Sequence, residues 1–164
     1  MNWSYPLLIL VQLVVAVLVG AGATYLGVLL FGRATRGIDE WQELRKGNAA
    51  IGIVLGAIVV AIAWVLRPTL YVPAGGWDVG IFRAIAALGV EAMQLLLGFV
   101  LALLSILFSL WLFDRLTTHL DEWAELRRGN VAVACMLAGV ILAVSLLVGV
   151  AVDGILKLVT PYLF

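Results

Sequence analysis

Long apolar runs alternate with short polar segments along this chain, and the alternation predicts its elements. Four runs are long enough to cross a hydrocarbon core of roughly 30 Å, which takes about 20 helical residues. The short alternating segments typical of β-barrel spans are absent from the sequence. The pattern therefore predicts an all-α membrane protein with four transmembrane helices, at residues 6–31, 49–66, 84–113 and 131–152.

The polar segments inside the two halves carry one motif twice. DEWQELRKGN at Asp39–Asn48 returns as DEWAELRRGN at Asp121–Asn130, 82 residues later and identical at eight of ten positions. This predicts two tandem hairpin repeats of parallel topology, related by an axis along the membrane normal. The predicted parts are repeat 1 at 1–66 with its bend at 32–48, a Pro- and Gly-rich outer loop at 67–83, and repeat 2 at 84–164 with its bend at 114–130.

Each motif predicts a short amphipathic helix at the membrane interface. Trp41 and Leu44, with their counterparts Trp123 and Leu126, are expected to face the acyl boundary, and Thr118 to form a capping box with the second motif. The Gly-Asn pair predicts a left-handed helix end followed by an N-cap for the next span. The motif residues of interest are Asp39, Glu40, Trp41, Glu43, Arg45, Gly47, Asn48, Asp121, Glu122, Trp123, Glu125, Arg127, Gly129 and Asn130.

Composition places the chain outside the soluble class, with 65% hydrophobic and 12% charged residues; a soluble domain has about 25% charged residues. The basic residues give an orientation, because positive residues remain cytoplasmic. Both bends are therefore predicted in the cytoplasm and both termini outside. The bends hold Arg33, Arg36, Arg45, Lys46, Arg115, Arg127 and Arg128, and the opposite side holds Arg67, Arg83 and Lys157.

The first apolar run has a competing interpretation as a signal peptide, because Ala21-Gly22-Ala23 resembles a cleavage site. No Lys or Arg precedes the run, however, and it continues apolar past that site. We therefore expect a retained helix. The single Cys135 makes no disulfide framework, so cysteine usage does not identify the compartment.

Small and polar residues recur on one face of each predicted span at the same offset of 82. Small faces let membrane helices approach closely, which favours packing within the subunit or a homo-oligomer. The alternative is a polar conduit lined by Gln12, Gln94, Ser105 and Ser109. The faces are Gln12, Ala16, Gly20, Ala23 and Gly27; Gln94, Gly98, Ala102, Ser105 and Ser109; Gly52, Gly56 and Ala63; and Ala134, Ala138 and Ser145.

The carboxylates of the bends allow three interpretations. Asp39 and Glu43, and likewise Asp121 and Glu125, form i,i+4 pairs that could hold a divalent cation with oxygen ligands. Ion pairs between the bends, Glu43 with Arg127 and Glu125 with Arg45, are the second interpretation. The third is a docking surface for a cytosolic protein partner.

Two further carboxylates, Glu91 and Asp153, fall inside apolar runs. Counted from the inner helix ends they lie about 33 Å away at 1.5 Å per residue, close to the outer interface. They are interpreted either as solvated boundary residues or as an acidic outer mouth that attracts cations. Asp153 is also spaced to pair with Lys157.

Nothing in the sequence forms a catalytic constellation. One histidine, His119, and one cysteine lie apart, without a phosphate loop or zinc spacing. Aromatic residues gather at the span ends rather than along a basic stripe. We therefore expect no enzymatic activity, no cofactor and no nucleic-acid partner, and expect the lipid bilayer, self-association and a possible cytosolic protein as partners.

The two copies of DEWxELRxGN, the following Asn130–Ala134 and the pairs Gly56-Ala57 and Ala138-Gly139 resemble the domain-of-unknown-function 350 family, over nearly the whole chain. That resemblance implies a four-helix, two-repeat protein of the bacterial inner membrane and carries over no catalytic residue. The predicted function is a homo-oligomer serving small-ion or solute passage or membrane-stress homeostasis. The alternative is a non-transporting scaffold whose bends recruit a partner.

Overall fold

The computed structural model describes residues 4–35, 39–70, 81–117 and 121–159. All regular structure in this part of the chain is helical, which confirms that the fold is all-α. The elements are α1 (Ser4–Ala34), α2 (Glu40–Arg45), α3 (Ala49–Leu66), the 3-10 helix η1 (Arg67–Leu70), α4 (Ile81–Leu116), α5 (Glu122–Arg127) and α6 (Val131–Val159).

Four of these helices, α1, α3, α4 and α6, are long and apolar enough to cross a membrane. Three of them, α1, α4 and α6, extend past the predicted spans 6–31, 84–113 and 131–152, because helical hydrogen bonding continues into polar residues. At the end of α6, for example, Lys157 and Asp153 lie one turn apart with Nζ and Oδ2 at 2.6 Å. The apolar segments are Leu13–Arg33, Ala49–Thr69, Ala92–Leu116 and Val131–Leu158.

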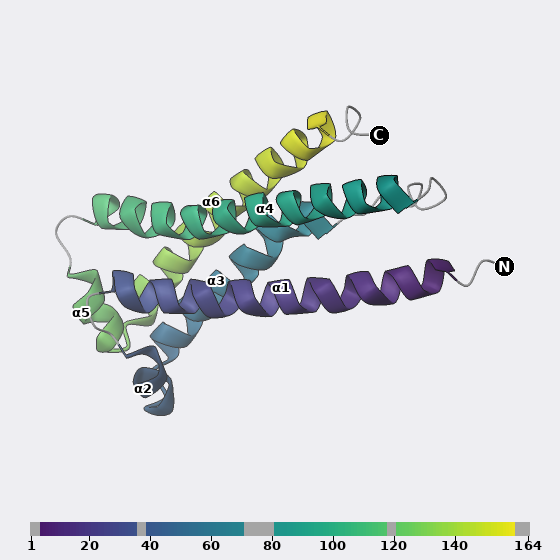
Figure 1. The fold of residues 1–164 in the computed structure, drawn as a ribbon. Coiled ribbons are helices and arrows are strands. Elements are labelled where there is room, and N and C mark those ends of the chain that lie inside the picture. Colours follow the sequence, from purple (N-terminus) through teal and green to yellow (C-terminus); the bar gives the residue numbers. More distant parts are fainter. Residues whose placement is uncertain (1–3, 36–38, 71–80, 118–120, 160–164) are drawn as a thin grey trace.

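The long helices form two differently inclined pairs (Figure 1). α1 and α4 run along the molecule, and α3 and α6 cross it at an angle. The most extensive contact between helices joins α3 to α6, and α4 packs against both. The short helices α2 and α5 lie at one end of the molecule, while the start of α1 and the end of α6 lie at the other.

The apolar core is built around α3. Its branched residues Ile51, Ile58 and Ile62 are at most 1% exposed. In contrast, Leu13 and Leu18 in the first half of α1 are 58% and 67% exposed. Such an extended apolar exterior marks a surface that meets lipid or protein. Around α3 lie the buried Phe31, Ile106, Phe113, Leu137 and Ile141.

Candidate functional site

The two short helices begin with the same cap. The backbone N–H of Gln42 donates to Asp39 Oδ1 at 3.0 Å, and that of Ala124 donates to Asp121 Oδ1 at 3.1 Å. The aspartate oxygen thus satisfies a donor that has no partner within the helix. Both aspartates serve as the N-cap itself, while Thr118, the capping residue expected for the second bend, lies outside the described residues.

Both short helices also end alike, with a left-handed glycine. Gly47 has φ +78° and Gly129 has φ +81°. The next backbone N–H, of Asn48 or Asn130, donates to the carbonyl of Glu43 or Glu125 at 3.0 Å. This is the Schellman closure, in which a residue without Cβ adopts the left-handed conformation at little cost. The predicted role of the glycines is confirmed.

The asparagine that follows links each short helix to the next long one. Asn48 Oδ1 accepts the backbone N–H of Ala50 and Ile51 at 3.1 and 3.3 Å, and its Nδ2 donates to Glu43 Oε2 at 2.9 Å. Asn130 repeats this arrangement, with 2.8 Å to Glu125 Oε2. One amide therefore caps a membrane helix and holds a carboxylate, which fixes the angle between the two helices.

The bend carboxylates form ion pairs within their own bends. Glu43 Oε1 lies 2.7 Å from Lys46 Nζ, and Glu125 Oε1 lies 2.9 Å from Arg128 Nη1. The Asn48 amide first, and then Lys46, lower the pKa of Glu43 below its ordinary range. Asn130 and Arg128 lower the pKa of Glu125 in the same order.

This pairing corrects the expectation of ion pairs between the bends. Within the described residues, Glu43 does not form an ion pair with Arg127, nor Glu125 with Arg45. The i,i+3 partner lies on the same helical turn, so a pair forms without ordering a second segment. The cation interpretation also gains no support, because no group of three or more His, Cys, Asp or Glu in the described residues is placed to hold a metal.

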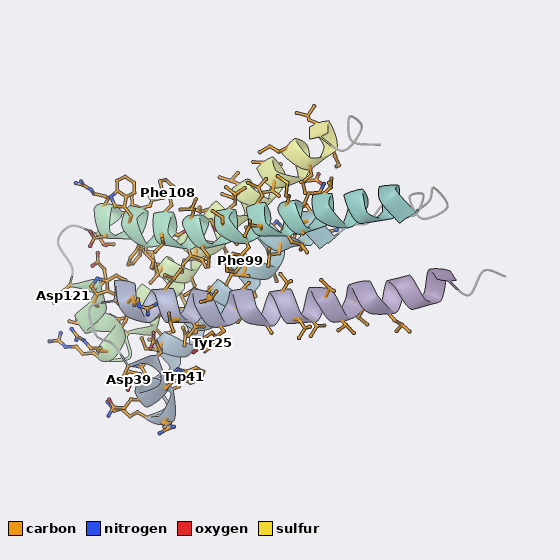
Figure 2. The ribbon with its side chains drawn as sticks, viewed as in Figure 1. Tyr25, Asp39, Trp41, Phe99, Phe108 and Asp121 are labelled. Carbon is orange, nitrogen blue, oxygen red and sulfur yellow. The ribbon has the colours of Figure 1, made fainter. Side chains whose placement is uncertain are left out.

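An asparagine amide, rather than an ion pair, joins the bends. Asn48 Nδ2 also donates to the carbonyl of Leu126 at 2.9 Å and lies 3.4 Å from that of Arg127. These are carbonyls of the last turn of α5. The Leu126 carbonyl also accepts the backbone N–H of Gly129 at 3.0 Å, and a carbonyl oxygen has a second lone pair for the Asn48 amide. Figure 2 shows Asp39, Trp41 and Asp121 at this shared end of the molecule. The two bends therefore form one connected structure.

Comparison with known proteins places the chain in a family. The family described as Domain of Unknown Function (DUF350) matches it twice, over residues 5–97 and 87–161. The chain belongs to the DUF350 family. No curated protein and no solved structure matches it. The suspected DUF350 resemblance is confirmed, and the family description supplies no activity.

The apolar side chains of the two DUF350 bends have different environments. Trp123 packs edge-on against Phe31 of α1 with ring centroids 6.3 Å apart, and Leu126 is fully buried. Their counterparts Trp41 and Leu44 are 60% and 38% exposed. The expectation that Leu126 faces the acyl boundary is therefore wrong, because α5 packs against α3 and α6 and this side chain is enclosed. Trp123 is half-buried against α1.

Two bend carboxylates are buried, a feature that the sequence analysis missed. Glu40 lies against Gly32 of α1, where a Cβ would overlap its carboxyl. Glu122 contacts the hydroxyl of Thr117, which is itself buried at the end of α4. A signal was present in the sequence, because Phe-x-Arg-x-Thr precedes both copies of the ten-residue motif, ending at Thr35 and Thr117. Burial raises the pKa of Glu122, and the neighbouring Asp114 and Asp121 raise it further.

The residues of the proposed conduit do not form a polar path within the described part of this DUF350 chain. Ser105 and Ser109 are buried, and their hydroxyls donate to the carbonyls of Ala102 and Ser105 at 2.8 and 2.7 Å. Gln94 is half-buried. The side chains of Gln12 and Glu91, and His119, lie outside the described residues. Asp153 is paired with Lys157 and half-exposed, as the spacing predicted.

Proposed function

We propose that this protein is a non-enzymatic, non-transporting scaffold of the bacterial cytoplasmic membrane, whose joined bends form a docking surface for a cytosolic protein. The observation that carries this proposal is the dry packing of the serine-containing faces. Ion passage along the axis of an oligomer is the competing function. The two differ in whether polar side chains meet water inside the membrane.

The hydroxyl groups on these faces are already satisfied. Ser145 donates to the carbonyl of Leu142 at 2.9 Å, as Ser105 and Ser109 do to carbonyls of their own helix. Such bonds to the preceding turn satisfy a serine in an apolar setting without water. Within the described residues, no buried side-chain nitrogen or oxygen lacks a hydrogen-bond partner. Satisfied, buried hydroxyls favour helix packing over ion conduction.

Flux through reconstituted vesicles tests this role. We expect liposomes that contain the purified protein to remain tight to small cations and anions at both signs of voltage. In a Cys135→Ser background, Ser109→Cys should resist a water-soluble thiol reagent and Asp153→Cys should react. Ion flux that Ser109→Leu abolishes would establish the conduit and contradict the scaffold.

The proposed topology places both bends in the cytoplasm and both termini outside, with the two halves as parallel repeats. Seven of the ten basic residues on the bend side support this orientation, as does the grouping of α2 and α5 at one end (Figure 1). In the Cys135→Ser background, Arg45→Cys and Arg127→Cys should resist an impermeant thiol reagent added to spheroplasts, while Lys157→Cys should react. Labelling of the bends from outside would reverse the topology.

We assign membrane contact at the bends to α2 rather than to α5. The exposed Trp41 and Leu44 support this, because an exposed tryptophan suits the boundary between lipid and water. Leu44 also lies against Gly52 at the start of α3, a membrane-length helix. α5 offers a smaller apolar face, since Leu126 is fully buried and Trp123 is half-buried against Phe31. A fluorescent label at Trp41→Cys should be quenched by brominated lipids, and one at Trp123→Cys should not.

The partner surface is assigned to the exposed basic side chains that α2 and α5 present side by side. Arg45 and Arg127 are exposed, and neither forms a salt bridge within the described residues. A photoreactive residue at Arg45 should give a defined adduct in cells, lost in Arg127→Glu. The same residue at Lys157 is the control and should give none. An adduct that survives Arg127→Glu would remove this surface from the proposal.

Self-association is proposed through the small face of α3. Gly56 and Ala63 on that face are exposed, and a Cβ at Gly56 would meet no atom within 4 Å. The equivalent residues of α6, Ala138 and Ser145, are buried inside the subunit. Gly56→Leu should therefore reduce particle size in detergent, with Gly20→Leu as the matched control because it too has open space around it. Equal particle sizes would exclude this face.

A further inference from the structure

A row of exposed aromatic and basic side chains follows one side of α4 towards the bends. Leu104, Phe108 and Trp111 are 53%, 50% and 53% exposed, and Arg115 on the next turn is exposed as well. Their spacings of four, three and four residues place them on one side of the helix. Figure 2 shows Phe108 on the side of α4 turned away from α1. We call these residues the aromatic face of α4.

The side chains of the aromatic face contact one another. The rings of Phe108 and Trp111 stack, with centroids 5.6 Å apart and an interplanar angle of 29°. The Arg115 guanidinium lies over the Trp111 ring, 5.8 Å from its centroid, within the range of a cation–π interaction. Such contacts restrict the side chains before anything binds, which lowers the entropy cost of binding. The aromatic face is therefore a prearranged surface.

Arg115 has no anionic partner in the described part of the chain. None of the salt bridges there includes it. The carboxylate next to it in sequence, Asp114, projects about 100° around the helix axis and lies close enough to Glu122 to raise the pKa of that carboxyl. A guanidinium matches the oxygens of a phosphate with two parallel hydrogen bonds. The aromatic face thus ends in a positive charge suited to a phosphate.

The length of the aromatic face matches one leaflet of a bilayer. Arg115 lies in the last turn of Ala92–Leu116, the apolar segment of α4, so in a membrane the exposed side of this segment meets acyl chains. From Leu104 to Arg115 the helix rises about 16 Å at 1.5 Å per residue. Half of a hydrocarbon core of roughly 30 Å is about 15 Å. A phosphate at Arg115 would therefore place acyl carbons along the rings, towards the middle of the bilayer.

We propose that the aromatic face of α4 is a binding site for one anionic phospholipid, with the lipid phosphate on Arg115 and an acyl chain along the rings of Trp111 and Phe108. The unpaired guanidinium favours a lipid with a net negative charge, and the apolar rings favour a lipid over a soluble phosphate. In the proposed topology this lipid belongs to the cytoplasmic leaflet. The site depends neither on partner docking nor on ion passage.

The first repeat supplies a matched control. Arg33 near the end of α1 corresponds to Arg115 and is also exposed. Leu29 and Leu26 stand at the positions of the two rings, and Arg33 makes no cation–π contact within the described residues. The two arginines therefore lie at equivalent positions and differ in the rings beside them. A difference between their variants reports the aromatic face and not the general positive charge of the bends.

Lipid competition measured by native mass spectrometry on the full-length protein tests this site. The protein in detergent is mixed with equal amounts of phosphatidylglycerol and phosphatidylcholine that have the same acyl chains. We expect one phosphatidylglycerol to be retained per chain in preference to phosphatidylcholine. Arg115→Gln should lower the ratio of the two bound lipids about fivefold, the effect of one basic residue at an anionic lipid surface. Trp111→Leu should also lower the ratio, and Arg33→Gln should keep it.

Two further measurements leave Arg115 and Trp111 intact. Glycerol 3-phosphate carries the phosphate without the acyl chains and should not displace bound phosphatidylglycerol. A photoreactive residue at Leu104 should form an adduct with a phospholipid in cell membranes, identified by its mass. Both results remain decisive if the substituted variants fold poorly.

Four results would overturn the site. Equal loss of the lipid ratio in Arg33→Gln and Arg115→Gln would assign the preference to general positive charge. Equal retention of the two lipids by the parent protein would leave an unselective contact with acyl chains. Displacement by glycerol 3-phosphate would indicate a simple anion site. An adduct from Leu104 to a second copy of the chain, or to another protein, in place of lipid would make this face a protein interface.

Discussion

The two bends have nearly one sequence and one set of local hydrogen bonds, yet they have different surroundings. The hydrogen bonds of the aspartate caps are 3.0 and 3.1 Å long, and those from the asparagine amides to the glutamates are 2.9 and 2.8 Å. The glycines have φ +78° and +81°. The second bend buries Leu126 and packs Trp123 on Phe31, whereas the first leaves Leu44 and Trp41 exposed. The repeated motif therefore determines the hydrogen bonds that cap and end each short helix. The long helices beside each bend determine which of its apolar side chains are buried.

The long helices beside each bend explain this difference. α3 contacts both short helices, and α5 additionally contacts α6. Among the described residues, the side chain of Asn48 reaches across from the first bend and donates to the last turn of α5. The first bend thus stabilises the second and keeps its own apolar side chains outside. The same substitution made at equivalent positions of the two bends separates stability that comes from local hydrogen bonds from stability that comes from packing against the long helices.

The largest difference is expected at the leucines. Leu126→Ala should destabilise the protein by about 2–5 kcal/mol, the usual loss for a buried leucine. Leu44→Ala removes a partly exposed side chain and should cost less than half as much. Thermal unfolding in detergent measures both. Equal losses would show that α2 is covered as fully as α5.

The asparagines should show the next largest difference. Asn130→Ala loses a helix cap, which costs about 0.5–2 kcal/mol. Asn48→Ala loses the same cap and also the bond to Leu126, worth about 0.5–1.5 kcal/mol more. Denaturant unfolding of the pair gives the difference. If Asn130→Ala proves the more harmful, the link between the bends does not depend on Asn48.

The glycines should behave alike in the two bends, because their role is local. Gly47→Ala and Gly129→Ala each force an alanine into the left-handed region, at about 1–2 kcal/mol. Both variants should lower the melting temperature by similar amounts. Unequal shifts would mean that the surroundings, rather than φ, decide the cost.

The smallest effects are expected from the paired carboxylates. The pKa of Glu43 and of Glu125 is lowered, so their contribution is present above the ordinary value of 4.5 and lost as pH falls through the lowered pKa. In the parent protein, each of these two carboxylates should cause a small loss of stability as the pH falls below 4.5, and Glu43→Gln or Glu125→Gln should remove it. The raised pKa of Glu122 gives the opposite dependence, a loss of stability as the pH rises. Stability measured against pH in these two variants and in Glu122→Gln checks this contrast.

The sequence predicted the helices, turns and caps that form from neighbouring residues, but not the contacts between segments that are distant along the chain. Apolar runs predicted the four long helices, and the Gly-Asn pairs predicted the turn and cap at Asn48 and Asn130. Burial of Glu122 was missed, because charged residues in a polar segment are ordinarily solvated and its neighbour Thr117 belongs to the second repeated pattern, Phe-x-Arg-x-Thr, outside the repeated ten residues. Symmetry between the repeats predicted ion pairs across the bends. In the structure, each glutamate pairs instead with the base three residues later in its own bend, Glu43 with Lys46 and Glu125 with Arg128.

The central claim is that the two bends form one unit joined through Asn48, and hydrogen exchange tests it most directly. Peptides covering 39–48 and 121–130 should be compared in the parent protein, Asn48→Ala and Asn130→Ala at one pH. The account predicts that Asn48→Ala accelerates exchange in both peptides, while Asn130→Ala accelerates it only in 121–130 and the start of α6. Unchanged exchange of 121–130 in Asn48→Ala would contradict the claim and leave two independent bends.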